Sequence, residues 1–262
     1  MKEVVEKYYD GVSEGYDKTH SKRFVDDIFE HFMIKYLPKR KKLNILDAGG
    51  GIGRFSFPLV KSGHKIVLTD ISNGMVEKAK NLATKEKLRN IDFFKESVTD
   101  MKNQKNNSFD IVLLMNGVLD YCKDHKKALK EVKRVLKKGG ILIGTVNNRF
   151  VYSTTNILIP YDKNLHKNIK KFKNAFRTGN YRSPSGWITH DFNPEELRDD
   201  LDKQVGKTIE ILGVTNLVRK WEYPNILTKD NRKELLRLQI EFAEKKEFIN
   251  NSSDFFFIAE KK

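Results

Sequence analysis

Cysteine is almost missing from this chain, since Cys122 stands alone among 262 residues. A single cysteine excludes an intramolecular disulfide and leaves no zinc-type cysteine cluster. No apolar run is long enough to span a membrane, and the charged segment 1–12 lacks the apolar stretch of a signal peptide. We therefore expect a cytoplasmic protein with no metal site and no membrane partner.

Acidic residues are in deficit relative to basic ones. The 35 Asp and Glu residues face 50 Lys and Arg residues, which gives a formal net charge of +15. Such an excess favours an anionic partner. The chain is also rich in Asn and Ile, however, and an AT-rich genome would produce this composition together with many Lys residues. The length and the 39% hydrophobic content suffice for one sizeable core, or for one core with an appendage.

The most informative stretch is 43–56, LNILDAGGGIGRFS. Its apolar run suits a buried parallel strand that ends at Asp47. The glycines that follow allow backbone angles that other residues resist, and they let a ligand approach the main chain closely. A helix that begins near residue 54 would direct its free N–H groups back at the loop. Strand, acid, glycine loop and helix together predict a nucleotide-type pocket.

The loop separates three kinds of ligand. A phosphate-binding P-loop needs Gly-Lys-Ser/Thr at its end, but this loop ends Gly53-Arg54-Phe55. A dinucleotide fingerprint needs a small residue at its third position, which Arg54 occupies. S-adenosylmethionine carries a positive sulfonium and an amino group instead of a pyrophosphate, so it tolerates Asp47 beside the glycines. Asp47 therefore favours S-adenosylmethionine over a pyrophosphate ligand.

The run LDAGGGIGR closely resembles the first motif of the class I S-adenosylmethionine-dependent methyltransferases, an acid followed by glycines at alternate positions. The resemblance implies S-adenosylmethionine as cofactor and S-adenosylhomocysteine as product. Asp70 ends the run KIVLTD 17 residues beyond Gly53, where a carboxylate can accept both ribose hydroxyls. NAD enzymes use an acid in the same way, and a strand-terminal Asp also caps helices, so Asp70 alone does not identify the cofactor.

The resemblance implies further cofactor contacts at the same edge of the sheet. Tyr16 would fold over the methionine end, with ordinary core packing as its alternative, and Asn116 would lie beside that end. Glu96 and a backbone N–H in the following turn would meet the adenine. The complete expected set is Tyr16, Asp47, Gly49, Gly51, Gly53, Asp70, Ile71, Met75, Glu96, Ser97, Val98 and Asn116.

Alternating apolar runs and helical periods predict a doubly wound α/β sheet. Strands are expected at 43–46, 65–70, 91–95, 109–115, 141–146, 208–214 and 255–260, of which the family resemblance makes the last antiparallel. Helices are expected at 24–37, 54–62, 74–87, 125–138 and 232–249. We expect an N-terminal helical lid over 1–42 and a Rossmann-like domain over 43–262, with substrate-side insertions at about 147–190 and 215–254.

The segment 163–182 holds seven Lys and Arg residues and no acid, interleaved with Phe172, Phe176 and Tyr181. It is either a solvated amphipathic helix or a lid that recognises an anionic substrate or nucleic acid. The helical spacing of Phe172 and Phe176 favours inward packing of their rings. For a small anionic acceptor, the expected contacts are Lys167, Lys171 and Arg177.

Methyl transfer from a sulfonium is an in-line displacement, in which the protein mainly aligns the reactants. A base is needed only where the nucleophile must lose a proton. His190, in the run WITHDF, is the candidate base because its charge changes near neutral pH. The alternative is a packed or capping histidine just before a helix.

The leading hypothesis is a methyltransferase acting on an intracellular, anionic small molecule. The second is a tRNA-modifying methyltransferase, because LDAGGGIGR, GHKIVLTDIS and GVTNLVRKWEYPN are similar to the bacterial enzymes that esterify 5-carboxymethoxyuridine in tRNA. A third, from another class, is a regulator that binds S-adenosylmethionine without catalysis. NAD-dependent oxidation is disfavoured by Arg54.

Overall fold

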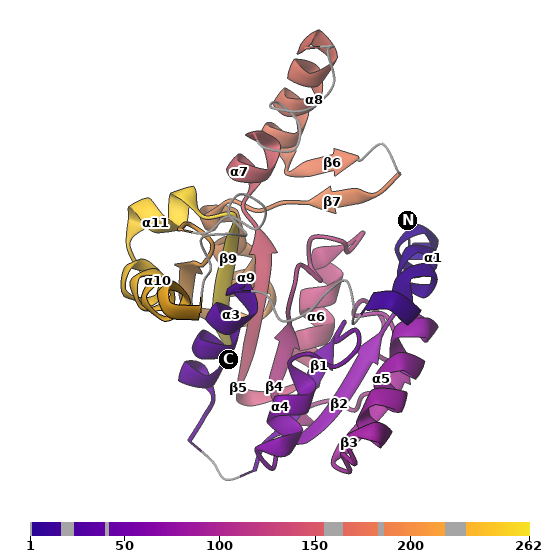
Figure 1. The fold of residues 1–262 in the computed structure, drawn as a ribbon. Coiled ribbons are helices and arrows are strands. Elements are labelled where there is room, and N and C mark those ends of the chain that lie inside the picture. Colours follow the sequence, from indigo (N-terminus) through magenta and orange to yellow (C-terminus); the bar gives the residue numbers. More distant parts are fainter. Residues whose placement is uncertain (1, 17–23, 40–41, 155–164, 183–185, 218–228) are drawn as a thin grey trace.

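The computed structural model describes residues 2–16, 24–39, 42–154, 165–182, 186–217 and 229–262, with only the helical backbone at 2–3, 165–168 and 229–230. Its centre is a seven-stranded sheet in the order β3-β2-β1-β4-β5-β9-β8 (Figure 1). The strands are β1 (Asn44–Ala48), β2 (Lys65–Asp70), β3 (Ile91–Lys95), β4 (Phe109–Leu114), β5 (Leu136–Asn147), β8 (Gly206–Gly213) and β9 (Asp254–Lys261).

The strand directions confirm the predicted doubly wound sheet. Strands β3, β2, β1, β4 and β5 are parallel to one another, and β9 is antiparallel to both β5 and β8. The chain runs outward from β1 through β2 to β3 and then crosses back to β4, so β1 lies at the switch point. A crevice therefore opens at the carboxyl ends of β1 and β4, where open parallel sheets bind their ligands.

Helices cover both faces of the sheet, and neighbouring residues of one strand enter different cores. Ile45 packs into the core formed with α3 (Phe24–Tyr36), α4 (Ser56–Lys61) and α10 (Lys229–Phe242). Leu46 packs into the opposite core, formed with α6 (His125–Val135) and α9 (Pro194–Gln204). A strand buried on both faces needs apolar residues at successive positions, which is why the strand sequences are nearly continuous apolar runs.

Two predicted helices have different boundaries in the structure. The helix expected over 125–138 ends at Val135, because Leu136 already pairs with Phe109 as the first residue of β5. The helix expected over 232–249 is wrong as one element: α10 is followed by a separate α11 (Lys246–Asn251). The break leaves the buried Ala243 carbonyl free to accept the Gly213 N–H at 2.9 Å. In both places, pairing with the sheet overrides the local helical pattern.

The N-terminal segment 1–42 divides into two parts with different positions. Helix α1 (Lys2–Val12) and the short helix η1 (Ser13–Gly15) pack on α5 (Asn73–Lys85), beside the carboxyl ends of the strands (Figure 1). The Asp10 carboxylate accepts bonds from the Ser72 hydroxyl at 2.6 Å and the Gly74 N–H at 2.9 Å. By contrast, α3 packs into the core of the sheet.

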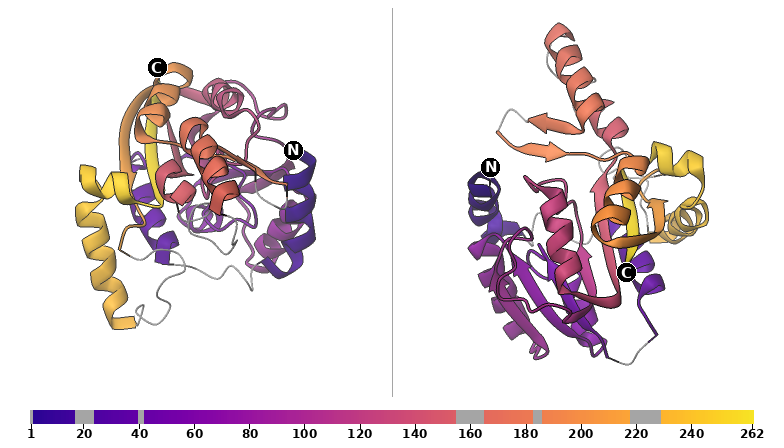
Figure 2. Two further views of the ribbon diagram at one scale, coloured as in Figure 1. Left: turned by 90° about the horizontal axis from the view of Figure 1, so that it is seen from above. Right: turned by 180° about the vertical axis from the view of Figure 1, so that it is seen from behind.

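The segment after β5 rises away from the sheet. It comprises α7 (Arg149–Ser153), α8 (Leu165–Thr178) and the hairpin of β6 (Asn180–Arg182) and β7 (Ile188–His190). Figures 1 and 2 show α8 projecting beyond the hairpin, on the side of the sheet where the strands end. Among the described helices, none combines the length and apolar character needed to cross a membrane.

Candidate functional site

A cavity of about 650 Å³ lies at the carboxyl ends of the central strands. Apart from Gly53, every residue of the expected cofactor set lines it: Tyr16, Asp47, Gly49, Gly51, Asp70, Ile71, Met75, Glu96, Ser97, Val98 and Asn116. The fold thus gathers residues from 16 to 116 in the sequence around one space.

The glycine loop is shaped by left-handed backbone and by close contact with β2. Gly49, Gly51 and Gly53 have φ values of 80°, 55° and 91°, which other residues adopt at a cost. The Gly49 N–H donates to the Thr69 carbonyl at 2.8 Å. A side chain on Gly53 would lie 2.3 Å from the Phe57 ring. Gly53 therefore allows α4 to pack closely beneath the loop, although it does not line the cavity.

Asp47 lines the cavity, and one of its carboxylate oxygens is buried without a hydrogen-bond partner among the described residues. The side chain is 1% exposed, and its Oδ2 atom accepts a bond from the Ser56 hydroxyl at 2.7 Å. The buried Oδ1 atom has no hydrogen-bond partner in the described part of the chain. Burial raises the pKa of Asp47 to about 6. Since an unpaired buried acceptor is costly, the site fits a ligand that brings a positive charge or an N–H donor.

Asp70 is held in a fixed orientation by the backbone around it. Its Oδ2 atom accepts the Gly51 N–H at 2.9 Å, and its Oδ1 atom accepts the Ser72 N–H at 2.9 Å. Burial outweighs these bonds and raises the pKa of Asp70 to about 6. Each carboxylate oxygen can accept two bonds, so both retain capacity for the hydroxyls of a ligand.

Glu96 and Asn116 reach the cavity lining from the ends of different strands, β3 and β4. Glu96 is 8% exposed and accepts the Asn103 N–H and the Gln104 amide, each at 2.7 Å, so it anchors the loop after β3. Asn116 has a left-handed φ of 58°, and its N–H donates to the Thr145 hydroxyl at 2.8 Å. The exposed Asn116 side chain is thereby held at the end of β4.

Aromatic rings from three distant segments meet at the cavity. Tyr9 and Tyr121 line it, and Trp187 follows in the loop before β7. The Trp187 ring lies 5.3 Å from that of Tyr121, 6.1 Å from that of Tyr9 and 4.5 Å from that of Tyr8. Sequence reasoning missed Tyr121 and Trp187, because nothing in the local sequence brings residues 121 and 187 together.

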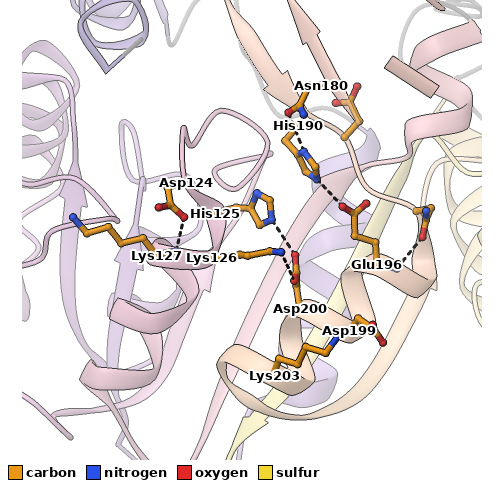
Figure 3. A network of polar contacts seen from close by, with 12 residues as sticks. Asp124, His125, Lys126, Lys127, Asn180, His190, Glu196, Asp199, Asp200 and Lys203 are labelled. Atoms are coloured by element: carbon orange, nitrogen blue, oxygen red, sulfur yellow. Dashed lines mark hydrogen bonds and ion pairs between the residues drawn. The ribbon is translucent and has the colours of Figure 1, made fainter. Parts of the chain in front are cut away.

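His190, the predicted base, lies outside the cavity lining. Its Nδ1 atom is 3.1 Å from Asn180 Oδ1, and its Nε2 atom is 3.2 Å from Glu196 Oε1 (Figure 3). Its ring stacks on that of His125, with centroids 4.4 Å apart. Both ring nitrogens therefore have partners within the protein, which is the arrangement expected of a packed histidine.

His125, which the sequence did not single out, does line the cavity. Its Nε2 atom lies 2.9 Å from Asp200 Oδ2 (Figure 3). It is the first residue of α6, directly after the helix cap Asp124, whose carboxylate accepts the Lys127 N–H at 2.8 Å. Lys123, Lys126 and Lys127 are also in the lining. The cavity thus carries positive charge on the side formed by the start of α6.

The predicted substrate cations belong to α8, apart from the cavity lining. Arg177 is exposed and Lys171 is half-buried, whereas the Lys167 side chain lies outside the described residues. The expected inward packing is wrong for Phe176, whose side chain is 45% exposed. Helical spacing places Phe172 and Phe176 on one face, which is only partly covered, since Phe172 is half-buried and Phe176 is exposed.

Comparison with known proteins gives the following matches. The model of a family described as "Methyltransferase domain" matches residues 39–238. An uncharacterized protein of Methanocaldococcus jannaschii is 35% identical over 196 residues, covering 74% of this chain and 68% of its own length. The tRNA 5-carboxymethoxyuridine methyltransferase of Escherichia coli is 31% identical over 103 residues, so the match spans only 39% of each chain.

Solved structures share the fold. The 1,6-didemethyltoxoflavin-N1-methyltransferase of Burkholderia thailandensis, crystallised with its substrate and S-adenosylhomocysteine, superposes with a TM-score of 0.62. It is 15% identical, and the match covers 99% of this chain and 88% of that one.

Proposed function

Since the chain belongs to the methyltransferase-domain family, whose cofactor is S-adenosylmethionine, we propose that it catalyses methyl transfer from this cofactor to an anionic acceptor. One observation carries the proposal: the unpartnered, buried Oδ1 atom of Asp47. Asp47 and Asp70 line the same cavity, together with the glycine loop. A cationic ligand with ribose hydroxyls satisfies both carboxylates at once, whereas a pyrophosphate would be repelled by them.

The residues of the cavity divide by what they can hold. Asp47 would accept bonds from the amino group of the methionine part, and Asp70 from the ribose hydroxyls. Ser97 and Val98, in the turn after β3, would border the adenine. When bound, the cofactor supplies a methyl group on a positive sulfur. Tyr9, Tyr16 and Tyr121 would exclude water from that end and hold the acceptor in line, which is where most of the rate advantage arises.

The anionic character of the acceptor is supported by the lysines in the lining. Lys123, Lys126 and Lys127 border the cavity, and no carboxylate neutralises Lys123 or Lys127 through an ion pair within the described residues. An anion entering beside them would be attracted. The expected inward packing of Phe172 and Phe176 was one reason to prefer a free small molecule as the acceptor. The exposure of Phe176 removes part of that support and favours an acceptor carried on RNA.

Calorimetric titration with S-adenosylhomocysteine, S-adenosylmethionine and NADH tests the proposal. We expect the two S-adenosyl ligands to bind and NADH to give no heat. Incubating a cell extract with cofactor labelled in the methyl group then tests for transfer, and a labelled anionic product is expected. Binding of NADH without the S-adenosyl ligands would overturn the proposal. Cofactor binding without any labelled product would favour the non-catalytic regulator instead.

A further inference from the structure

A second positively charged region lies outside the cavity, on the projecting segment after β5. We define the basic arm as residues 165–182, which comprise α8 and β6. The arm contains no Asp or Glu. Figures 1 and 2 show that α8 projects beyond the β6–β7 hairpin and points away from the sheet.

The cations of the arm have no acidic partner within the part of the chain that the structure describes. Elsewhere, Lys61 pairs with Glu86 at 2.7 Å, and Lys203 pairs with Asp199 at 2.9 Å. Over the described residues, no ion pair involves the cations of the arm, namely Lys170, Lys171, Lys173, Arg177 and Arg182. All but Lys171 are exposed. Like charges gathered without counter-charges repel one another, and this repulsion is relieved by an anionic partner.

Aromatic rings stand beside these cations. The Phe172 and Phe176 rings are stacked, with centroids 5.6 Å apart and an interplanar angle of 22°. Phe150, from α7, meets Phe176 edge-on at 6.0 Å. Phe150 is 50% exposed and Phe176 is 45% exposed. Exposed rings among unpaired cations are the combination with which proteins bind single-stranded nucleic acid, because the rings stack on bases while the cations follow the phosphates.

The arm is linked to the cavity lining through the β6–β7 hairpin. Its strand β6 pairs with β7, with Tyr181 opposite Thr189. Trp187, just before β7, contacts the ring of Tyr121 in the cavity lining. A polyanion held on the arm would therefore extend toward the opening, where Lys123 and Lys127 continue the positive charge.

We propose that the basic arm binds single-stranded RNA, and that the methyl acceptor is a nucleotide of that RNA. This deepens the proposed function by naming its substrate class. RNA presents unstacked bases in its loops, which suits exposed phenyl rings. A membrane surface fits less well, since a helix lying in the interface needs a broad apolar face. Among the described side chains, the apolar face contains Ile169, Phe172 and Phe176, of which the first two are half-buried.

The test measures binding of fluorescently labelled, unfractionated tRNA to the full chain across a salt series. Two variants alter the arm: Lys170→Glu/Lys173→Glu removes cations, and Phe150→Ala/Phe176→Ala removes the exposed rings. The matched control is Lys85→Glu/Lys105→Glu, which makes the same change in charge. Its exposed lysines precede β3 and β4, so they lie toward the ends at which these strands begin, whereas the arm lies on the side where the strands end (Figure 1). Calorimetry with S-adenosylhomocysteine accompanies every variant.

The cation variant should weaken tRNA binding by at least about tenfold and lower the slope of log affinity against log salt by about two units. The ring variant should weaken binding by about tenfold with little change of slope. The control should weaken binding far less than the cation variant. Every variant should bind S-adenosylhomocysteine as the wild type does, because none of the substituted residues lines the cavity.

Three outcomes would overturn the RNA proposal. One is an absence of tRNA binding by a wild type that still binds S-adenosylhomocysteine, which would leave the methyltransferase proposal standing. Another is equal weakening of tRNA binding by the cation variant and the control variant, which would mean that net charge alone attracts tRNA. The third is arm-dependent binding to vesicles of phosphatidylcholine with phosphatidylglycerol that exceeds binding to tRNA. Failure to bind S-adenosylhomocysteine with tRNA binding intact would instead contradict the proposed function.

Discussion

Among single residues, Asp70 offers a direct test of how a ribose would be held. Its carboxylate is oriented by the N–H groups of Gly51 and Ser72. A bond to a charged acceptor contributes about 1.5–3 kcal/mol, so Asp70→Ala should weaken S-adenosylhomocysteine binding by at least about tenfold. Calorimetry measures the affinity, and circular dichroism checks that the variant is folded. Asp92→Ala, at an exposed position on β3, is the control and should bind normally.

Asp47 tests the charge of the ligand. If Asp47 faces the amino group of the methionine part, Asp47→Asn should lower the affinity for S-adenosylmethionine more than that for adenosine, which lacks this group. Competition binding on the same preparation measures both affinities. Equal losses for the two ligands would mean that Asp47 only shapes the loop through its bond to Ser56.

The pKa of Asp47 also predicts a dependence of stability on pH. Burial raises this pKa to about 6 in the folded state, above the value of about 3.9 in unfolded chains. The folded state then binds the proton more tightly, so this group lowers stability as pH rises from about 4 to 6 and keeps it lowered above that range. The Tm of Asp47→Asn, relative to wild type and without ligand, should rise between pH 4 and pH 7. A constant difference would contradict this account.

At the scale of elements, the docking of α1 on α5 can be tested through Asp10. Asp10 accepts bonds from Ser72 and Gly74 at the start of α5, and these bonds lower its pKa. Losing hydrogen bonds such as these two costs about 1 kcal/mol, so Asp10→Ala should speed hydrogen exchange in α1. Because α1 carries Tyr9 over the cavity, S-adenosylhomocysteine affinity should fall about fivefold. Glu14→Ala, at a neighbouring exposed position, should change neither quantity; an equal effect would show that these bonds are not the cause.

The ends of two helices differ from those that the local sequence pattern predicts. Helical periodicity located α5 and α6 but carried α6 three residues too far, because Leu136 gains a partner in β4. A similar competition divides the segment that includes α10 and α11. Local propensities are small in comparison with the burial and pairing that a central sheet offers.

For the whole molecule, the fold predicts one cooperative unfolding transition. Both cores share the same sheet, and α3 from the N-terminal segment packs into one of them. S-adenosylhomocysteine at about a hundredfold excess over its Kd should stabilise this unit by about 2.7 kcal/mol. Scanning calorimetry should show a single transition that shifts upward with the ligand. Two transitions, of which only one responds, would mean that the segments beyond the sheet fold separately.

The amino-acid sequence by itself determined the features that depend on residues close together in the chain. The strand, the acid and the left-handed glycines of 43–56 occur together because one turn needs them, so this loop and the family it resembles were predictable. The antiparallel last strand followed from the same resemblance, and the structure confirms it. The cofactor inferred from Asp47 agrees with the family to which the chain belongs.

What only the tertiary structure decided were contacts between distant segments. Arg54 forms an ion pair with Asp26 of α3. His125, and not His190, lines the cavity. The Trp187 ring contacts the Tyr121 ring. No local period encodes such contacts, because they depend on how helices and loops close over the sheet after it forms. The exposure of Phe176 has the same origin: helical spacing sets the face on which a ring lies, and only the surrounding chain decides whether that face is covered.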